Sequence, residues 1–375
     1  MRTLLRISAV VLAVWSFTGC GASDSACGPG HDDMPAVVDD DTDLATFWIG
    51  TVGVSELNII GAGAEHTTLV QAHFEDMTDY QVYVAQRTLL SDACFLYEGR
   101  PEVLRRCRPV DPCDDTHPCP APFVCRAGSC FAPHQSCTDD AECDPALRCD
   151  RDTGQCDAVR CNSESCGTNF ACQEGSPTPL RVERVAFTGI TWTGGAAELV
   201  PDPDKKYRLP PKVLPLRAYA GTEVGIQVFA SGSGEQDYPA FAETLRVPEA
   251  PTLTHLDQHS GEALADGPSL GIDEHRTEAL TVSWKKGNGD YVEVLLSPGS
   301  GSDTPWKKLR CITFDDGCLE IPAEGIALLA RDTATNFNFK IERHSFKLVQ
   351  LLDGTVLRAV GLLDLSAELQ GVVGR

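Results

Sequence analysis

One stretch of the chain reads Ser136-Cys137-Thr138-Asp139-Asp140-Ala141-Glu142-Cys143-Asp144-Pro145-Ala146-Leu147-Arg148-Cys149. It belongs to a repeat, because Cys113, Cys137 and Cys161 are each 24 residues apart and acidic residues follow the first cysteine in the first two units. Those two units hold four cysteines each, whereas the third stops at Cys172 with three. A unit this short cannot bury a useful apolar core, so we expect disulfides to hold it together.

The number of cysteines supports the same expectation. Of the 17 cysteines, twelve lie between Cys107 and Cys172, and setting Cys20 aside leaves sixteen, an even number that can pair completely. In an oxidising compartment such cysteines form disulfides. The disulfide candidates are Cys27, Cys94, Cys107, Cys113, Cys119, Cys125, Cys130, Cys137, Cys143, Cys149, Cys156, Cys161, Cys166, Cys172, Cys311 and Cys318.

Spacing also indicates partners for the cysteines outside the repeat. Cys311 and Cys318 bracket a short turn sequence, so we expect them to pair with each other across a hairpin. Thirteen cysteines lie between Cys94 and Cys172, so one of them needs a partner elsewhere, and Cys27 is the natural candidate. The connectivity within the repeat stays open.

A zinc site is the alternative use of clustered cysteines. No two cysteines here are separated by two residues, and no histidine stands at ligand spacing among them. His255 and His259 are four residues apart, but in a Gly, Asp and Ser rich stretch that does not favour a helix. The acidic segments lack the spacing of a calcium loop. We therefore expect no metal site and no cofactor.

The repeat, with its closing Gly154-Gln155-Cys156, resembles the cysteine-rich repeats of the Dickkopf N-terminal type, which also occur in bacterial surface lipoproteins. EGF-like modules are the alternative. The resemblance covers about 60 of the 375 residues and implies extracellular protein binding without catalysis.

The N-terminus predicts export. Arg2 and Arg6 precede a short apolar run, and Gly19 stands directly before Cys20. This resembles the lipobox of bacterial lipoproteins and implies a signal peptide over residues 1–19, acylation of Cys20 and a membrane anchor. Gly21, in place of Asp, resembles the pattern for export to the outer membrane, with possible exposure at the cell surface. An ordinary secretory signal with a chance cysteine is the alternative.

The net charge of the chain limits the kinds of partner that we expect. The chain has 54 Asp and Glu against 31 Lys and Arg, a formal net charge of −23, which argues against a nucleic-acid partner and against electrostatic docking on anionic lipid. Residues 20–44 are rich in Gly, Ser, Pro and Asp, so we expect an acidic flexible tether there.

Strand-like segments flank the repeat on both sides, and the predicted fold class is mainly β. We expect two β-sandwich-like domains, with the disulfide-rich module (residues 107–178) inserted in the first. The first domain takes residues 45–106 and 179–248, and the second takes residues 249–375.

Within the second domain, a hairpin is predicted from Leu280-Thr281-Val282-Ser283-Trp284 and Tyr291-Val292-Glu293-Val294-Leu295-Leu296. It resembles the early strands of fibronectin type III or immunoglobulin-like domains. Residues 322–330 are predicted to be helical, with Pro322 at the first position.

No nucleophile elbow, zinc-protease motif, P-loop or dinucleotide-binding motif is found, so we expect no catalytic residues and no enzyme activity. The sequence favours a membrane-anchored envelope lipoprotein that presents its cysteine-rich module for binding protein or glycan. Two alternatives stay open: a purely structural, protease-resistant envelope protein, and a hydrolase with carboxylates on sandwich loops.

Overall fold

The structure is a computed structural model of the full chain, and the fold described here concerns Cys27 and most of residues 48–374. The longer gaps between described segments are 60–66, 77–81, 193–197, 203–206, 209–214, 233–236, 261–267, 300–306 and 331–335, with further short gaps in the cysteine-rich stretch and elsewhere. The predicted signal peptide, Cys20 and the predicted tether apart from Cys27 lie outside the described residues.

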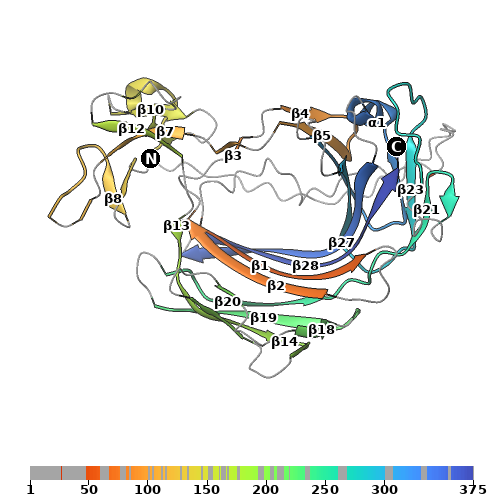
Figure 1. The fold of residues 1–375 in the computed structure, drawn as a ribbon. Coiled ribbons are helices and arrows are strands. Elements are labelled where there is room, and N and C mark those ends of the chain that lie inside the picture. The colour runs from red at the N-terminus through yellow and green to blue at the C-terminus, as the bar shows by residue number, and fades with distance from the viewer. Residues whose placement is uncertain are drawn as a thin grey trace, which may run out of the picture.

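The protein is mainly β, as predicted, and a 14-stranded sheet runs through most of the part that is described (Figure 1). In spatial order its strands are β20 (Phe241–Arg246), β19 (Glu223–Ala230), β14 (Val182–Thr188), β16 (Glu198–Pro201), β17 (Tyr207–Arg208), β2 (Thr67–Asp76), β1 (Trp48–Ile59), β28 (Val356–Gly374), β27 (Asn336–Asp353), β24 (Tyr291–Pro298), β25 (Lys307–Thr313), β5 (Cys94–Glu98) and β4 (Gln86–Leu89), with β13 (Thr178–Pro179) paired to β2.

Smaller elements complete the described fold. A second sheet contains β22 (His259–Ser260), β21 (Leu253–Leu256), β23 (Leu280–Trp284) and β26 (Cys318–Ile321). Outside the cysteine-rich stretch, β15 (Ile190–Trp192) pairs with β18 (Pro215–Ala218), and β3 (Val82–Tyr83) pairs with β6 (Glu102–Val103). The predicted helix is confirmed as α1 (Ala323–Ala330). Among the described residues, no helix has the length and hydropathy needed to cross a bilayer.

The longest strands hold the fold together. β27 and β28 form an antiparallel pair of 18 and 19 residues, and β28 also pairs in parallel with β1. This pairing connects the N-terminal and C-terminal ends of the described chain. Figure 1 shows the sheet curving along β27 and β28, with its β14, β19 and β20 end below β1, β2 and β28, and with β21 and β23 of the second sheet outside its other arm.

Two apolar cores lie on one side of β27 and β28. The first core packs β1, β2 and β28 against β14, β19 and β20, and it includes Phe74, Tyr238 and Leu363. The second packs β24, β25 and β27 against the four-stranded sheet and α1, and it includes Trp284 and Phe339. From Asn336 to Glu342 along β27, buried apolar residues alternate with polar ones, so this part of the strand carries polar side chains on the face opposite the second core, whereas residues 341–345 are all buried.

The two cores exchange elements that are far apart in the sequence. Ala93, Cys94 and Leu96 precede the cysteine-rich stretch but belong to the second core, whereas Leu363 and Leu365, from the last strand, belong to the first. The cysteine-rich segment between residues 107 and 172 is inserted in the sequence of the main sheet, as predicted, and Figure 1 shows it at one end of the molecule.

The predicted hairpin over residues 280–296 is wrong. Both strands exist, but β23 pairs with β21 and β26, whereas β24 pairs with β25 and β27 in the main sheet. The connection between them is held by the buried carboxylate of Asp315, which accepts hydrogen bonds from the backbone N–H groups of Gly287 and Gly289. The chain therefore crosses from one sheet to the other instead of turning back within one.

Candidate functional site

The cysteine-rich module consists of units with the same disulfide pattern. In the first unit Cys113 pairs with Cys125 and Cys119 with Cys130, so the first cysteine pairs with the third and the second with the fourth. The second unit repeats this with Cys137–Cys149 and Cys143–Cys156. In each unit the third and fourth cysteines face each other on a small hairpin, formed by β8 (Val124–Arg126) with β9 (Ser129–Phe131) and by β10 (Leu147–Asp150) with β11 (Gln155–Ala158).

The third unit is completed from outside its own sequence. Cys161 pairs with Cys172, and Cys166 pairs with Cys107. β7 (Arg105–Pro109) and β12 (Phe170–Glu174) pair with Cys107 opposite Cys172, which reproduces the arrangement of Cys125 opposite Cys130. Cys107 therefore takes the position of the missing fourth cysteine. Because the strands that open and close the module pair with each other, the module can be inserted into the main fold.

The acidic residues shared by the repeats shape turns. Asp114 accepts hydrogen bonds from the backbone N–H groups of Thr116 and His117, each at 2.7 Å. Hydrogen bonds from Thr116 and His117 lower the pKa of Asp114. Asp139 accepts from the N–H of Ala141 at 2.8 Å and caps the short 3₁₀ turn η2 (Asp140–Glu142). These carboxylates have a structural role in their units.

Sulfur atoms gather inside the module but provide no metal site. Three groups of cysteine sulfurs, one in each unit, lie within 4.8 Å of one another, and every member is in a disulfide. A disulfide sulfur is not the thiolate that zinc requires. A small core that includes Phe123 and Leu147 surrounds these sulfurs. Arg106 contacts Asp157 at 2.6 Å, which connects β7 with the second unit.

Two disulfides outside the module correct the predicted pairings. Cys311 pairs with Cys94 and Cys318 pairs with Cys27, so neither the predicted Cys311–Cys318 bond nor a bond from Cys27 to the module is present. The physical reason is sheet pairing: β5 and β25 are neighbours with Cys94 directly opposite Cys311, whereas Cys318 begins β26 in the other sheet.

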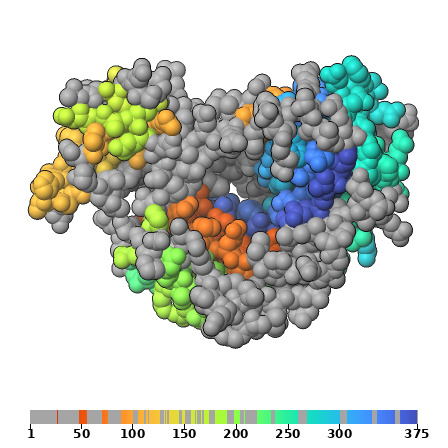
Figure 2. Space-filling view, in the orientation of Figure 1, coloured from red at the N-terminus to blue at the C-terminus, as the bar shows by residue number. Residues whose placement is uncertain are grey.

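A polar surface that we call the inner face lies opposite the two cores on β24, β25, β27 and β28. It carries the side chains that alternate with core residues along each strand. Figure 2 shows the molecule hollowed on this side, between the C-terminal strands and β1–β2. The charged and aromatic members of the inner face include Tyr291, Glu293, Arg310, Lys340, Glu342, His344, Asp364 and Glu368.

The charged groups of the inner face neutralise one another. Arg310 donates to Glu293 at 2.8 Å. Lys340 donates to Glu368 at 3.1 Å and also to Glu342. His344 also belongs to this network, with its Nε2 3.8 Å from Glu342. Glu293, Glu342 and His344 are all buried, and buried charges of this kind need close partners.

His344 is the least exposed titratable group of this network. Its ring stacks on Tyr291 with centroids 4.4 Å apart, its Nδ1 lies 3.0 Å from Asp364, and its Nε2 lies 3.8 Å from Glu342. Burial alone would lower the pKa of His344, but the hydrogen bond with Asp364 and the nearby carboxylates, including Glu293, raise it.

The pKa of Glu342 moves in the opposite direction. Burial alone would raise it, but the charges of His344 and Lys340, together with hydrogen bonds from Lys340 and Ser366, hold the pKa of Glu342 below its ordinary value. Glu342 and Glu368 thus converge on one ammonium group, and Glu342 is ionised near neutral pH.

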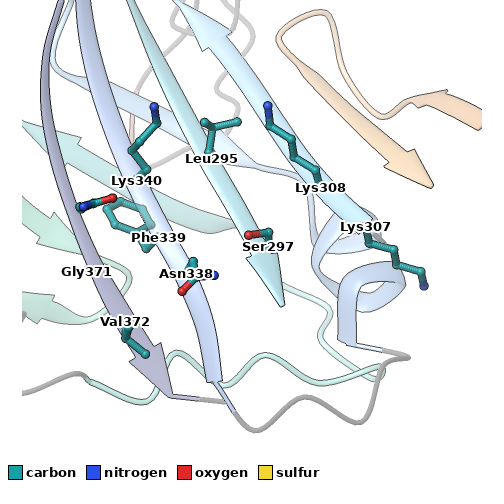
Figure 3. Close-up of a pocket in the computed structure, with 10 residues that line it drawn as sticks. Leu295, Ser297, Lys307, Lys308, Asn338, Phe339, Lys340, Gly371 and Val372 are labelled. Carbon is teal, nitrogen blue, oxygen red and sulfur yellow. The ribbon is translucent and has the colours of Figure 1, made fainter. Parts of the chain in front are cut away.

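A pocket opens on the inner face next to this network (Figure 3). Its volume is about 550 Å³, in the range of small-molecule sites. Its wall combines amide, hydroxyl and ammonium side chains with apolar ones, and Figure 3 shows Lys308, Lys340 and Leu295 pointing to the same side. The lining residues are Leu295, Ser297, Lys307, Lys308, Asn338, Phe339, Lys340, Gln370, Gly371 and Val372.

Sequence reasoning missed this pocket. The sequence does contain one signal for the polar surface beside the pocket, which is the alternation of Asn338, Lys340, Glu342 and His344 with core residues. This alternation predicts that the strand has a polar face, but it does not say which strands lie next to it. His255 and His259 lie on the paired strands β21 and β22.

No protein-family model matches this chain, and no curated protein matches it. These comparisons therefore assign no family to this mainly β architecture with its cysteine-rich, disulfide-paired module. Many disulfides suggest an oxidising, extracytoplasmic location.

Proposed function

We propose that this protein is an exported, membrane-anchored binding protein without catalytic activity, and that the inner-face pocket holds an acidic saccharide. The observation that carries the proposal is the pocket itself. It has the volume of a small ligand, and its polar wall comes from four adjacent strands of a rigid sheet.

The chemistry of the wall favours an acidic sugar. Ser297, Asn338 and Gln370 offer hydroxyl and amide groups that can donate to and accept from sugar hydroxyls. All the charged residues of the lining are lysines, although the whole chain has a net charge of −23. Lys340 contacts Glu342 and Glu368, and Lys307 contacts Glu98. A carboxylate on the ligand would complement the ammonium group of Lys308, which points to the pocket side (Figure 3).

The neighbouring carboxylates favour binding over hydrolysis. A hydrolase of the glycosidase type needs a protonated carboxyl group next to a second carboxylate. Glu342 and Glu368 converge, but both contact Lys340, and the pKa of Glu342 is lowered. A group ionised in this way is a poor proton donor near neutral pH.

The test is calorimetric titration of the protein with a galacturonate trisaccharide and with the neutral galactose trisaccharide. Binding of the acidic sugar is expected, with affinity lowered at least tenfold by Asn338→Leu or Gln370→Leu. Gln350→Leu is the matched control, because Gln350 lies on the same strand and face as Asn338 but away from the pocket. Equal weakening by all three variants, binding of neither sugar, or release of reducing ends during incubation would contradict the proposal.

The cysteine-rich module is proposed as a separate surface for a protein partner, in keeping with its resemblance to repeats of the Dickkopf N-terminal type. Its support is its position at one end of the molecule, on the paired strands β7 and β12 (Figure 1). The test variant replaces residues 110–169 with a short Gly-Ser linker and carries Cys107→Ser and Cys172→Ser, because the linker removes their partners Cys166 and Cys161; the strands β7 and β12 are kept. A partner captured from envelope extract by the full protein should be lost from this variant, while saccharide binding stays. Unchanged capture would favour a purely structural module.

The anchor is proposed to be acyl chains on Cys20, which would place the protein at the outer membrane. Mass spectrometry of the N-terminal peptide from native membranes should show cleavage before Cys20 and added acyl mass. An unmodified Cys20 would remove this part of the proposal.

A further inference from the structure

The disulfide between Cys27 and Cys318 decides where the body of the protein can lie relative to its anchor. Cys27 is seven residues after Cys20, and its Cα is 5.5 Å from that of Cys318. An extended chain spans at most about 3.3–3.6 Å per residue, so seven residues reach roughly 25 Å. Without the disulfide, the first described strand begins 28 residues after Cys20, which allows roughly 100 Å.

We infer that the end of the molecule around the β25–β26 turn rests on the surface of the bilayer that holds the anchor. The contact surface consists of Phe314, Lys285 and Lys286, and we call it the membrane-facing patch. This inference rests on the proposed anchor at Cys20, but its geometric part can be tested with any lipid attached there.

An exposed aromatic ring marks the patch. Phe314 is 47% exposed, although it directly follows buried Thr313 and lies four residues before Cys318. Aromatic side chains at this kind of position insert readily at the membrane–water interface. The disulfide, independently of the ring, limits the distance of this turn from Cys20, so the two observations indicate the same end of the molecule.

Two lysines lie beside the ring. The N–H of Trp284 donates to the carbonyl of Gly317 at 2.9 Å, which places Lys285 and Lys286 next to the Phe314 turn. Both lysines are exposed. They offset the carboxylate of Asp316, two residues after Phe314, so like-charge repulsion from anionic lipid is reduced here in a chain whose net charge is −23.

The membrane-facing patch does not need electrostatic attraction to the lipid in order to stay at the surface. The anchor supplies the affinity, and the short covalent connection raises the local concentration of Phe314 at the surface. This agrees with the overall negative charge, which argues against docking by charge alone.

The experiment places the photo-crosslinking residue benzoylphenylalanine at position 314 of the full chain, in vesicles of phosphatidylethanolamine and phosphatidylglycerol. The control position is Val200 on β16, which is 48% exposed and thus matched to Phe314. Lipid adducts at position 314 are expected to exceed those at position 200 at least fivefold. The double variant Cys27→Ser/Cys318→Ser should reduce the adducts at position 314 several-fold while the near-ultraviolet circular dichroism stays native.

The acyl mass at Cys20, measured on the same samples, separates this inference from the proposed anchor. Where Cys20 is unmodified, maleimide lipid in the vesicles couples to it, because the other sixteen cysteines are paired. The geometric claim is then tested with a synthetic anchor. Equal adducts at positions 314 and 200, or adducts at position 314 that do not depend on the disulfide, would overturn the inference.

Discussion

Asp315 connects Trp284, Arg343 and the turn between β23 and β24 through its side chain. Its carboxylate accepts from Trp284 Nε1 at 2.9 Å and faces Arg343, with Nε at 2.9 Å and a terminal nitrogen at 3.0 Å. It also holds the turn that carries Gly287 and Gly289. Arg343 in turn donates to the carbonyl of Lys285 at 2.6 Å.

Asp315→Asn should therefore destabilise the protein by about 3–5 kcal/mol, because it leaves the buried guanidinium of Arg343 without its counter-charge. Urea unfolding followed by tryptophan fluorescence, to which the buried Trp284 contributes, measures this. Glu223→Gln, at an exposed position of β19, is the control and should change stability by less than about 0.5 kcal/mol. A cost for Asp315→Asn as small as that of the control would contradict this role of the carboxylate.

The raised pKa of His344 leads us to expect that the stability of the protein depends on pH. Because its pKa is raised above the ordinary 6.5, its contribution is fully present below about pH 6.5 and is lost as pH rises through the folded value. The lowered pKa of Glu342 works oppositely: its contribution is present above the ordinary 4.5 and is lost as pH falls through the folded value.

Urea unfolding between pH 5.5 and 8.5 should thus show the free energy of unfolding falling relative to that of His344→Gln as pH rises past 6.5. Asp364, Glu342, Glu293, Lys340 and Arg310 face this ring or its neighbours and remain in both proteins. A difference between the two proteins that does not change with pH would show that His344 does not titrate in this range.

At the residue scale, the sequence predicts which face a side chain takes but not its partner. Alternation along Lys340, Glu342 and His344 indicates one polar face. The pairing of His344 with Asp364 depends on the register of β27 against β28, in which His344 lies opposite Ser366. That register follows from the connection between the strands and from the shared cores, neither of which the local pattern contains.

At the scale of elements, the packing of Tyr238 and Phe74 against β1 depends on a glycine. A Cβ added to Gly50 would lie 2.7 Å from the ring of Tyr238 and 2.8 Å from that of Phe74. Gly53, three residues along the same strand, has its nearest neighbour at 3.6 Å, which is ordinary contact.

Gly50→Ala should thus cost about 1–3 kcal/mol through overpacking, since both rings are buried. Gly53→Ala should be neutral or slightly stabilising, because alanine restricts the unfolded chain. Thermal unfolding of the two variants beside the native protein tests the pair. Equal effects would show that the packing of Tyr238 does not require a glycine at position 50.

The disulfide between Cys107 and Cys166, which closes the module, leads to a second prediction for individual elements. Cys107–Cys166 spans 59 residues, whereas Cys113–Cys125 spans 12. Each disulfide stabilises by about 2–4 kcal/mol, and the dependence on loop length predicts that removing the longer one costs about 1 kcal/mol more.

Hydrogen exchange can measure, strand by strand, how much stability the removal of each disulfide costs. Cys107→Ser/Cys166→Ser should reduce amide protection in β7 and β12, and Cys113→Ser/Cys125→Ser should reduce it in β8 and β9 instead. Both variants should leave β14 unchanged. Loss of protection throughout the module in both variants would indicate that the units are not separate.

Sequence reasoning predicts several of the strands and the repeat, but not which strands pair with each other. Strands such as Leu280–Trp284 follow from strict alternation, and the repeat follows from its 24-residue period. The partners of a strand are harder to predict: Trp284 lies in the core, but its strand pairs with β21 and β26, whose paired residues are 26 to 41 positions away in the sequence. The fourth cysteine of the last unit was missing from the sequence of that unit because Cys107 precedes the whole repeat.

At the scale of the whole molecule, the covalent connections link regions that are distant in the sequence. Cys27 is joined to the four-stranded sheet, Cys94 is joined to β25, and Cys107 closes the module. The long strands β27 and β28 carry both cores and the pocket on their two faces. Cysteine count predicted that pairing is complete; the connectivity depends on which strands become neighbours, which no spacing rule contains.

Peptide mapping of the unreduced protein by mass spectrometry tests this framework most directly. After digestion at low pH, which prevents disulfide exchange, the linked peptides should contain Cys27 with Cys318, Cys94 with Cys311, and Cys107 with Cys166. Recovery of a peptide that joins Cys311 to Cys318, or of one that joins Cys27 to the cysteine-rich module, would contradict the account.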